Sequence, residues 1–278
     1  MEIRKKADLD AFSRIALFQR ILPSDEYYLI IASRIISRKL LDLAERLSIR
    51  FVQIPSGVKL GDLKVKKQPK GKITSIKSWR VFTRVLLEEI TSIRNISIKE
   101  SISYAWTHRS VNTMLNLEIF EKEGDLIKIG NVEKALDLTA MERPMQELKM
   151  NEVSIPDDLD PMDISLNLNS LGIEHAFTCY TSGTLYSGYG TRHDSFQLYI
   201  KEKIDIGSFE RLFKGEGEVR KMVLYRPDRN VFEDIRKLDG LDCVSLDQTI
   251  MDLAGLGFSG RDMTLHMVRN YANIRLDQ

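Results

Sequence analysis

Apolar and polar positions alternate in blocks along the first 57 residues. The run at 27–32 (YYLIIA) is apolar, short and bounded, which is typical of a buried strand. Leucines recur on one side of 37–47, which predicts a helix, and 50–54 (RFVQI) is expected to form a second strand. A strand, a helix and a strand so close together predict a βαβ unit with parallel strands. An amphipathic helix is also expected over 9–21.

The sequence pattern of residues 97–116 predicts a helical hairpin. Residues 98–105 carry small or apolar side chains at helical spacing, which predicts a first short helix. Thr107 is placed as the N-cap of a second helix, because its hydroxyl can accept from an unpaired backbone N–H. This second helix, 107–116, is expected to bury Val111, Met114 and Leu115 and to turn the following residues outward: His108, Arg109, Ser110, Asn112, Thr113 and Asn116.

A β-hairpin is predicted directly after the second helix, where segments 117–120 and 126–129 flank the turn EKEGD. Helices are expected before and after this unit, over 78–90 and 132–142. Two helices joined by a short turn, the second with an acid-free outer face, describe a helix-turn-helix. The β-hairpin lies where a winged helix carries its wing. The alternative is an ordinary helical hairpin in some other core.

The rest of the chain is predicted to be a mixed α+β domain. Residues 144–163 contain three of the seven prolines and several acids, which is typical of an interdomain connection. After it we expect strands and two helices, the first of them capped by Ser245: strands over 196–200 and 221–225, helices over 244–256 and 262–271. The predicted fold class is therefore α+β, with four divisions: a small N-terminal α/β unit (1–70), a winged helix-turn-helix (71–143), a linker (144–163) and a C-terminal α+β domain (164–278).

The composition of the chain indicates the cellular compartment in which we expect it. Only two cysteines, Cys179 and Cys243, are present, so no disulfide framework is implied and a reducing cytoplasm is expected. No apolar run reaches the length of a transmembrane helix, and the N-terminus lacks the apolar core of a signal peptide.

The net charge of +1 conceals an asymmetry between the two halves of the chain. Residues 1–150 contain 27 Lys and Arg against 19 Asp and Glu, whereas residues 151–278 contain 14 against 21. The stretch 59–116 alone contains 12 basic and 4 acidic residues, so the excess coincides with the predicted helix-turn-helix. A basic end joined to an acidic body suits a polyanion that is bound at one end only.

The second helix of the hairpin is expected to enter the major groove of double-stranded DNA. Arg109 is suited to bidentate contact with guanine, and Asn112 and Asn116 to adenine edges. Thr107, His108, Ser110 and Thr113 complete this set of groove or phosphate contacts. Contacts to the DNA backbone are assigned to the basic residues before it: Lys66, Lys67, Lys70, Lys72, Lys77 and Arg80. The hairpin tip, with Glu121, Glu123 and Asp125, is too acidic to hold phosphates.

The sequence patterns that would indicate a catalytic function are weaker than those for DNA binding. The N-terminal βαβ unit is similar to half of a restriction-endonuclease-like domain, and Asp62 and Lys64 have the Asp-x-Lys spacing of such nucleases. A second carboxylate, from Asp42 or Glu26, is needed to hold Mg²⁺. The histidines and cysteines do not form a metal-ligand spacing, and no cofactor is implied. A G-x-G-x-x-G at 255–260 follows a predicted helix rather than a strand, which indicates a helix end.

Three stretches, taken in order, resemble the AbiEi-type antitoxin and transcriptional-regulator family of type IV toxin–antitoxin systems. Residues 27–57 look like its N-terminal strand–helix–strand unit, and residues 70–144 look like its winged helix and the helix after it. Pieces that look like its C-terminal domain follow at 177–189, 196–200 and 244–269. The resemblance implies an autorepressor of its own operon whose candidate partner is a nucleotidyltransferase-like toxin or the target of that toxin.

We therefore expect a transcriptional regulator that binds double-stranded DNA sequence-specifically and has no catalytic activity. The alternatives are a protein-interaction module that uses the winged helix as a docking surface, and a metal-dependent nuclease. The acidic C-terminal domain is expected to fold alone and to be dispensable for DNA binding. Its tyrosines, Tyr180, Tyr186 and Tyr189, either form a contact surface for a partner or pack within the domain. Ala105 stands at the position of the family's turn glycine.

Overall fold

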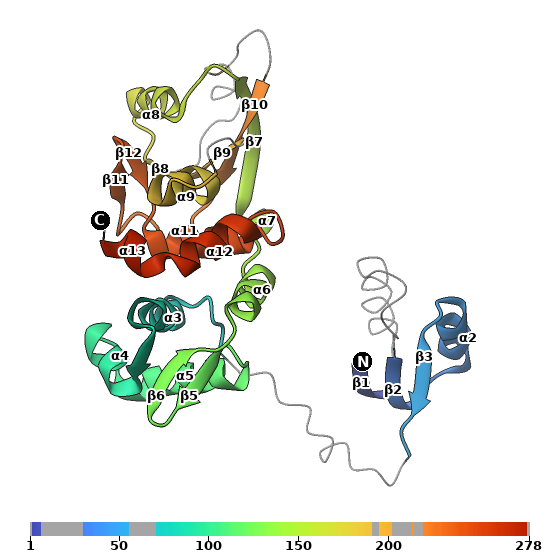
Figure 1. Cartoon of the computed structure of the whole chain (residues 1–278). Coiled ribbons are helices and arrows are strands. Elements are labelled where there is room, and N and C mark those ends of the chain that lie inside the picture. Colours follow the sequence, from blue (N-terminus) through green and yellow to red (C-terminus); the bar gives the residue numbers. More distant parts are fainter. Residues whose placement is uncertain are drawn as a thin grey trace. The chain divides into compact units, whose positions relative to one another are not determined.

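The computed structural model of the chain describes residues 2–6, 30–55, 71–190, 195–201, 213 and 219–276. The chain divides into two compact units, residues 1–68 and residues 69–278 (Figure 1). Helices and strands occur in both units, so the predicted α+β class is confirmed. The helix expected over 9–21 lies outside the described residues.

The described residues of unit 1 form a three-stranded parallel sheet and a helix: β1 (Glu2–Lys6), β2 (Ile30–Ile35), α2 (Arg38–Arg46) and β3 (Arg50–Gln53). β2 lies in the centre and pairs in parallel with both neighbours. Ile31, Ala44 and Ile49 form the buried centre between the sheet and α2. The predicted βαβ unit is confirmed, whereas β1 was not predicted because its sequence, EIRKK, lacks an apolar run.

The first part of unit 2, residues 71–143, is called the head segment here. Its elements are α3 (Ile76–Glu88), β4 (Ile90–Ser92), α4 (Ile93–Lys99), α5 (Tyr104–Asn116), β5 (Phe120–Glu123), β6 (Leu126–Ile129) and α6 (Val132–Glu142). β6 pairs in antiparallel fashion with β4 on one side and β5 on the other. Gly124 turns the β5–β6 hairpin at a φ of 62°, a conformation that costs glycine little.

The helical hairpin differs from its prediction in where each helix begins. α4 starts five residues earlier, because the Ser92 hydroxyl accepts from the Asn95 backbone N–H at 3.2 Å. The turn occupies residues 100–103, where Ser101 has a φ of 52°. α5 then begins after Ser103, so the prediction of Thr107 as N-cap is wrong. Ala105 lies within α5 rather than in the turn.

Residues 144–278 form the C-terminal segment. Its elements are α7 (Met145–Leu148), β7 (Lys149–Pro156), α8 (Pro161–Ser170), β8 (His175–Phe177), α9 (Cys179–Ser187), β9 (Ser195–Ile200), β10 (Val219–Tyr225), β11 (Arg236–Leu238), β12 (Leu241–Cys243), α11 (Leu246–Gly255), α12 (Arg261–Arg269) and α13 (Tyr271–Leu276). The strands form a mixed sheet in the order β11-β12-β8-β9-β10-β7.

Residues 144–163 are not a linker in the structure. They form α7, β7 and the start of α8, and β7 pairs along its length with β10. Pro156 ends β7, and Pro161 occupies the first turn of α8, where its missing N–H removes no helical hydrogen bond. The prolines therefore mark the ends of elements, which is the same sequence signal that a linker produces.

The tyrosines of α9 and the turn after it connect this helix to its neighbours. The Tyr186 hydroxyl donates to the Val244 backbone oxygen at 2.8 Å, and the Tyr180 hydroxyl donates to the Ser259 backbone oxygen. Tyr189 donates to the Asp262 carboxylate at 2.6 Å. Tyr180 and Tyr186 are half-buried and pack within the segment, whereas Tyr189 is exposed.

The head segment and the C-terminal segment share one hydrophobic core. α11 packs against α3 and α6, and α13 packs against α3 (Figure 1). Trp79 of α3 is buried, and its Nε1 donates to the Asp247 backbone oxygen of α11 at 2.8 Å. The Asp247 side chain accepts hydrogen bonds from Thr83 of α3 and Tyr271 of α13. Contrary to the expectation from the sequence, the two segments are therefore not separate folding units.

A buried polar cluster forms a second connection between the two segments. Arg143, at the end of α6, donates to Asp252 of α11 at 2.6 Å and to Asp228 at 2.8 Å. Asp252 has no exposed surface, and it also accepts from Thr178 at 2.5 Å and from Gln248 at 2.6 Å. Burial disfavours the charge of Arg143, but the neighbouring carboxylates outweigh it and raise its pKa.

Replacing Asp228 with asparagine is expected to remove stability that depends on pH. Burial disfavours the charge of Asp228, but hydrogen bonds from Arg143 and Arg229 outweigh it and hold its pKa well below the usual range. Such a carboxylate stabilises the fold above its unfolded-state pKa of about 4, and this stability is lost as the pH falls toward the folded-state pKa. Urea unfolding at about pH 7 and about pH 3 should show the advantage of the wild type shrinking at the lower pH. An equal difference at both pH values would contradict the assignment.

Candidate nucleic-acid interface

α5 presents a polar face without acidic residues to the solvent. Thr107, Ser110, Val111 and Met114 follow helical spacing and are buried against the rest of the head segment. The opposite face is exposed or half-buried and carries Tyr104, Ala105, His108, Arg109, Asn112 and Asn116. The predicted burial of Val111 and Met114 is confirmed, and Leu115 is half-buried.

Two residues of α5 that were predicted to contact DNA, Thr107 and Ser110, are buried. The Thr107 hydroxyl donates to the Ser103 backbone oxygen at 3.2 Å, within its own helix. The Ser110 hydroxyl lies 2.9 Å from that of Ser78 on α3, and this hydrogen bond is buried. Their prediction as DNA contacts, and that of Ser110 as outward-facing, is therefore wrong, because hydroxyls that find partners can occupy a core face.

The exposed residues of α5 differ in whether they already have a hydrogen-bond partner among the described residues. The Asn112 amide and the His108 ring form a hydrogen bond of 3.1 Å, and the His108 ring lies 6.1 Å from that of Tyr104. Arg109 forms no hydrogen bond or ion pair with any described residue. Its guanidinium is thus available for a ligand with two acceptors side by side.

Basic residues just before α3 and in its first turn border one side of α5. Lys72 and Lys77 are exposed, and the Lys77 Nζ lies 5.8 Å from the ring centre of Trp106 on α5. A Cβ built on Gly71 would lie 3.6 Å from the Thr113 Oγ1, so this part of the chain runs beside half-buried Thr113. The other three lysines predicted to contact DNA lie outside the described residues: Lys66, Lys67 and Lys70.

Arg80 has a partner other than a phosphate in the structure. Its Nε donates to the Glu100 carboxylate at 2.9 Å, and its Nη2 donates to the Glu100 backbone oxygen at 2.6 Å. Arg84 donates to the other oxygen of the same carboxylate at 2.7 Å. Glu100 lies in the turn between α4 and α5, so the two arginines of α3 position the start of α5.

The hairpin tip is exposed and acidic, as expected from Glu121, Glu123 and Asp125. Lys128 is paired with Glu123 at 3.0 Å, and the hydrogen bond that it donates to this carboxylate raises the pKa of Lys128. This pairing reduces the positive charge that the hairpin could offer a polyanion. The tip therefore does not extend the basic surface beside α5.

Tyr104 and Ala105 are surface residues that the sequence prediction did not include. They lie in the first turn of α5, which the prediction placed before the helix. Ser103 was the available signal, because serine is a favoured N-cap. Its spacing from the buried positions 107, 110, 111 and 114 fits a helix that begins at residue 104.

Residues proposed for other chemistries are dispersed or lie outside the described residues. Within the part of the chain that the structure describes, no three His, Cys, Asp or Glu residues are grouped as a metal site. Asp62, Lys64 and Glu26 are not described, and Asp42 is exposed on α2. Gly257 follows α11 at a φ of 67°, which agrees with a helix end rather than a phosphate-binding loop. None of the described helices has the length and apolar character needed to span a bilayer.

The surface of α5 thus carries the guanidinium of Arg109, which pairs with no described residue, and the amide side chains of Asn112 and Asn116. Lys72 and Lys77 form a basic border beside it. These groups match the acceptors of base edges and phosphates in chemistry. Comparison of the chain with protein-family models, curated proteins and solved structures finds no match.

Proposed function

We propose that this protein is a transcriptional regulator that binds double-stranded DNA sequence-specifically through α5. The observation that carries the proposal is the exposed, acid-free face of α5, on which the side chain of Arg109 pairs with none of the described residues. An α-helix with its side chains is about 10–12 Å wide, and the major groove is about 12 Å wide. Because Thr107, Ser110 and Met114 are buried on the other side of α5, this face is free to enter the groove.

The surroundings of α5 support the same function. The order α3-β4-α4-α5-β5-β6, with an antiparallel sheet, is the order expected of a winged helix-turn-helix, in which α5 is the recognition helix. Lys72 and Lys77 suit contacts to the DNA backbone, which fix the register of the protein without reading sequence. The resemblance to AbiEi-type antitoxins extends the proposal to repression of the protein's own operon.

Replacing Arg109 with alanine is expected to weaken binding to a selected duplex by about 1–3 kcal/mol and to relax specificity at one base pair. The cause is the loss of a bidentate contact to guanine. The experiment selects a duplex from a random library with the full-length wild type and measures both proteins on it by fluorescence anisotropy. Arg236→Ala, at an exposed arginine of β11, is the matched control and should bind as the wild type does. Wild-type affinity of the Arg109 variant would exclude α5 as the reading element.

Lys72→Ala separates contacts to the DNA backbone from base reading in the same experiment. It should weaken all duplexes alike and lower the slope of log affinity against log salt by about 1, since one phosphate contact is lost. The alternative is a docking role, in which the face of α5 binds another protein. Absence of salt-dependent duplex binding by the folded wild type would favour that alternative.

A further inference from the structure

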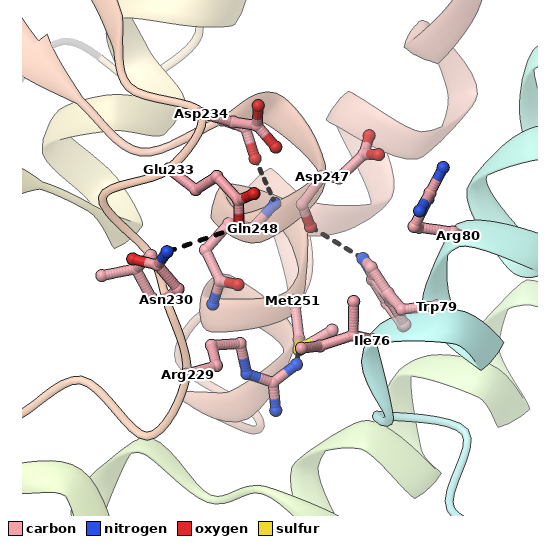
Figure 2. Close-up of a pocket in the computed structure, with 12 residues that line it drawn as sticks. Ile76, Trp79, Arg80, Arg229, Asn230, Glu233, Asp234, Asp247, Gln248 and Met251 are labelled. Atoms are coloured by element: carbon pink, nitrogen blue, oxygen red, sulfur yellow. Dashed lines mark hydrogen bonds between the residues drawn. The ribbon is translucent and has the colours of Figure 1, made fainter. Parts of the chain in front are cut away.

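A cavity of about 440 Å³ lies within unit 2, between the head segment and the C-terminal segment. α3, the end of α4, the loop 229–234 and α13 contribute to its wall. A smaller lobe of about 140 Å³ adjoins it, and both are lined by Ile76, Arg80, Glu233, Asp234 and Asp247. Figure 2 shows this lobe, with Glu233 and Asp234 of the loop on one side and Trp79 and Arg80 of α3 on the other.

Four charged side chains of the larger cavity's wall, two of each sign, have no ion-pair partner among the described residues. Lys99 of α4 and Arg275 of α13 have no ion-pair partner within 4.0 Å among the described residues. Glu233 and Asp234 form no ion pair within that distance either. The other arginines of the wall, Arg80 and Arg84, are already paired with Glu100. A ligand that carries one negative and one positive group would therefore find a partner for each.

The smaller lobe suits an uncharged group. Ile76, Val231 and Met251 contribute apolar surface to it, and Asn230 and Gln248 contribute amides. Arg229, the cation at its base in Figure 2, is occupied by Asp228 and by the Thr74 backbone oxygen at 2.9 Å. Glu233 and Asp234 also border this lobe, and the ammonium group of a ligand would occupy them. A charged ligand side chain would then find no further unpaired partner here, whereas an apolar or amide side chain would keep its contacts.

We propose that this cavity binds a free α-amino acid with an uncharged side chain. Its carboxylate is held by Lys99 and Arg275, its ammonium group by Glu233 and Asp234, and its side chain enters the smaller lobe. Small-molecule sites fix the orientation of a ligand in this way, with a few polar groups placed around an apolar recess.

Binding in this cavity has a direct connection to α5. Arg80 and Arg84 line the cavity, and they also hold Glu100 in the turn before α5. A ligand carboxylate held by Lys99, which adjoins Glu100 in the chain, would also attract these two guanidinium groups and so weaken their contacts with Glu100 at the start of α5. We therefore expect the amino acid to lower DNA affinity by about fivefold or more, the usual range of coupling between two sites. This regulatory step rests on the proposed function, whereas the binding site does not.

Isothermal titration of the full-length protein with the twenty free amino acids tests the site without DNA. One or more with uncharged side chains should bind with a Kd below about 1 mM. Two derivatives of the best binder test the two charges: the N-acetyl form lacks the ammonium group, and the amide form lacks the carboxylate. Neither should bind. Absence of binding by all twenty, or equal binding of either derivative, would overturn the proposal.

Two conservative variants then place the ligand in this cavity. Arg275→Gln and Asp234→Asn should each weaken binding about tenfold or more, because each removes one charge partner. Arg269→Gln and Asp239→Asn are matched controls, since both residues are exposed and lie outside the cavity wall. Circular dichroism verifies that each variant is folded. Equal loss in the controls, or wild-type binding by both cavity variants, would exclude this cavity as the site.

Anisotropy on the selected duplex, with and without the amino acid, tests the regulatory step. Binding of the ligand with unchanged DNA affinity would refute the coupling and leave the site intact. Ligand binding by a protein that binds no duplex would refute the proposed function but not the site.

Discussion

Replacing Arg143 with methionine is expected to lower the free energy of unfolding by about 3–5 kcal/mol, the usual effect of removing one partner from a buried ion pair. The Arg143 side chain is 5% exposed and that of Asp252 is fully buried, so the variant leaves a carboxylate without its cation in the core. Tyr199, Thr178 and Gln248 still donate to Asp252, but three neutral donors do not replace a positive charge. Urea unfolding followed by circular dichroism measures the change.

Arg261→Met is the matched control for this experiment. Arg261 also joins a head-segment helix to the C-terminal segment, through Glu133 at 2.8 Å and through Asp137. Its carboxylate partners are about 60% exposed, and exposed pairs contribute only about 0–1 kcal/mol. Equal losses in both variants would show that the buried pair contributes no more than a surface pair.

A fragment of residues 69–150, which holds the head segment without most of the C-terminal segment, is expected neither to fold nor to bind DNA. The cut removes α11 and α13, which cover α3, and exposes Trp79, now 3% exposed, to water. It also divides β7 near its start and removes Asp252 and Asp228, the partners of Arg143. These losses together exceed the stability of about 5–15 kcal/mol that a typical domain has.

The control fragment is residues 69–278, which keeps unit 2 whole. It should show helical circular dichroism, unfold cooperatively with urea and, under the proposed function, bind the selected duplex. A cooperative unfolding transition in the fragment that ends at 150 would show that the head segment is stable without the C-terminal segment. The charge asymmetry of the chain would then be a division between two domains after all.

Elements whose apolar positions repeat regularly were predictable from the sequence alone. α6 spans 132–142 as predicted, and α3 lies within two residues of its predicted bounds. β6 at 126–129 and the parallel pairing of β2 with β3 agree with their predictions in the same way. Local spacing suffices in these cases, because each element buries one continuous apolar face. The exposed position of Arg109 and the burial of Met114 follow from the same spacing.

The orientation of polar residues depended on partners that are distant in the sequence. Ser110 is buried because Ser78 of α3 supplies its hydrogen bond, and Arg80 is engaged because the turn before α5 brings Glu100 to it. The position of β7 in the sheet likewise depends on its pairing with β10, and the shared core of the two segments depends on α11. Neither contact can be predicted from the local sequence. Periodicity reports which residues avoid water, whereas the tertiary structure decides which polar groups find a partner and can therefore be buried with them.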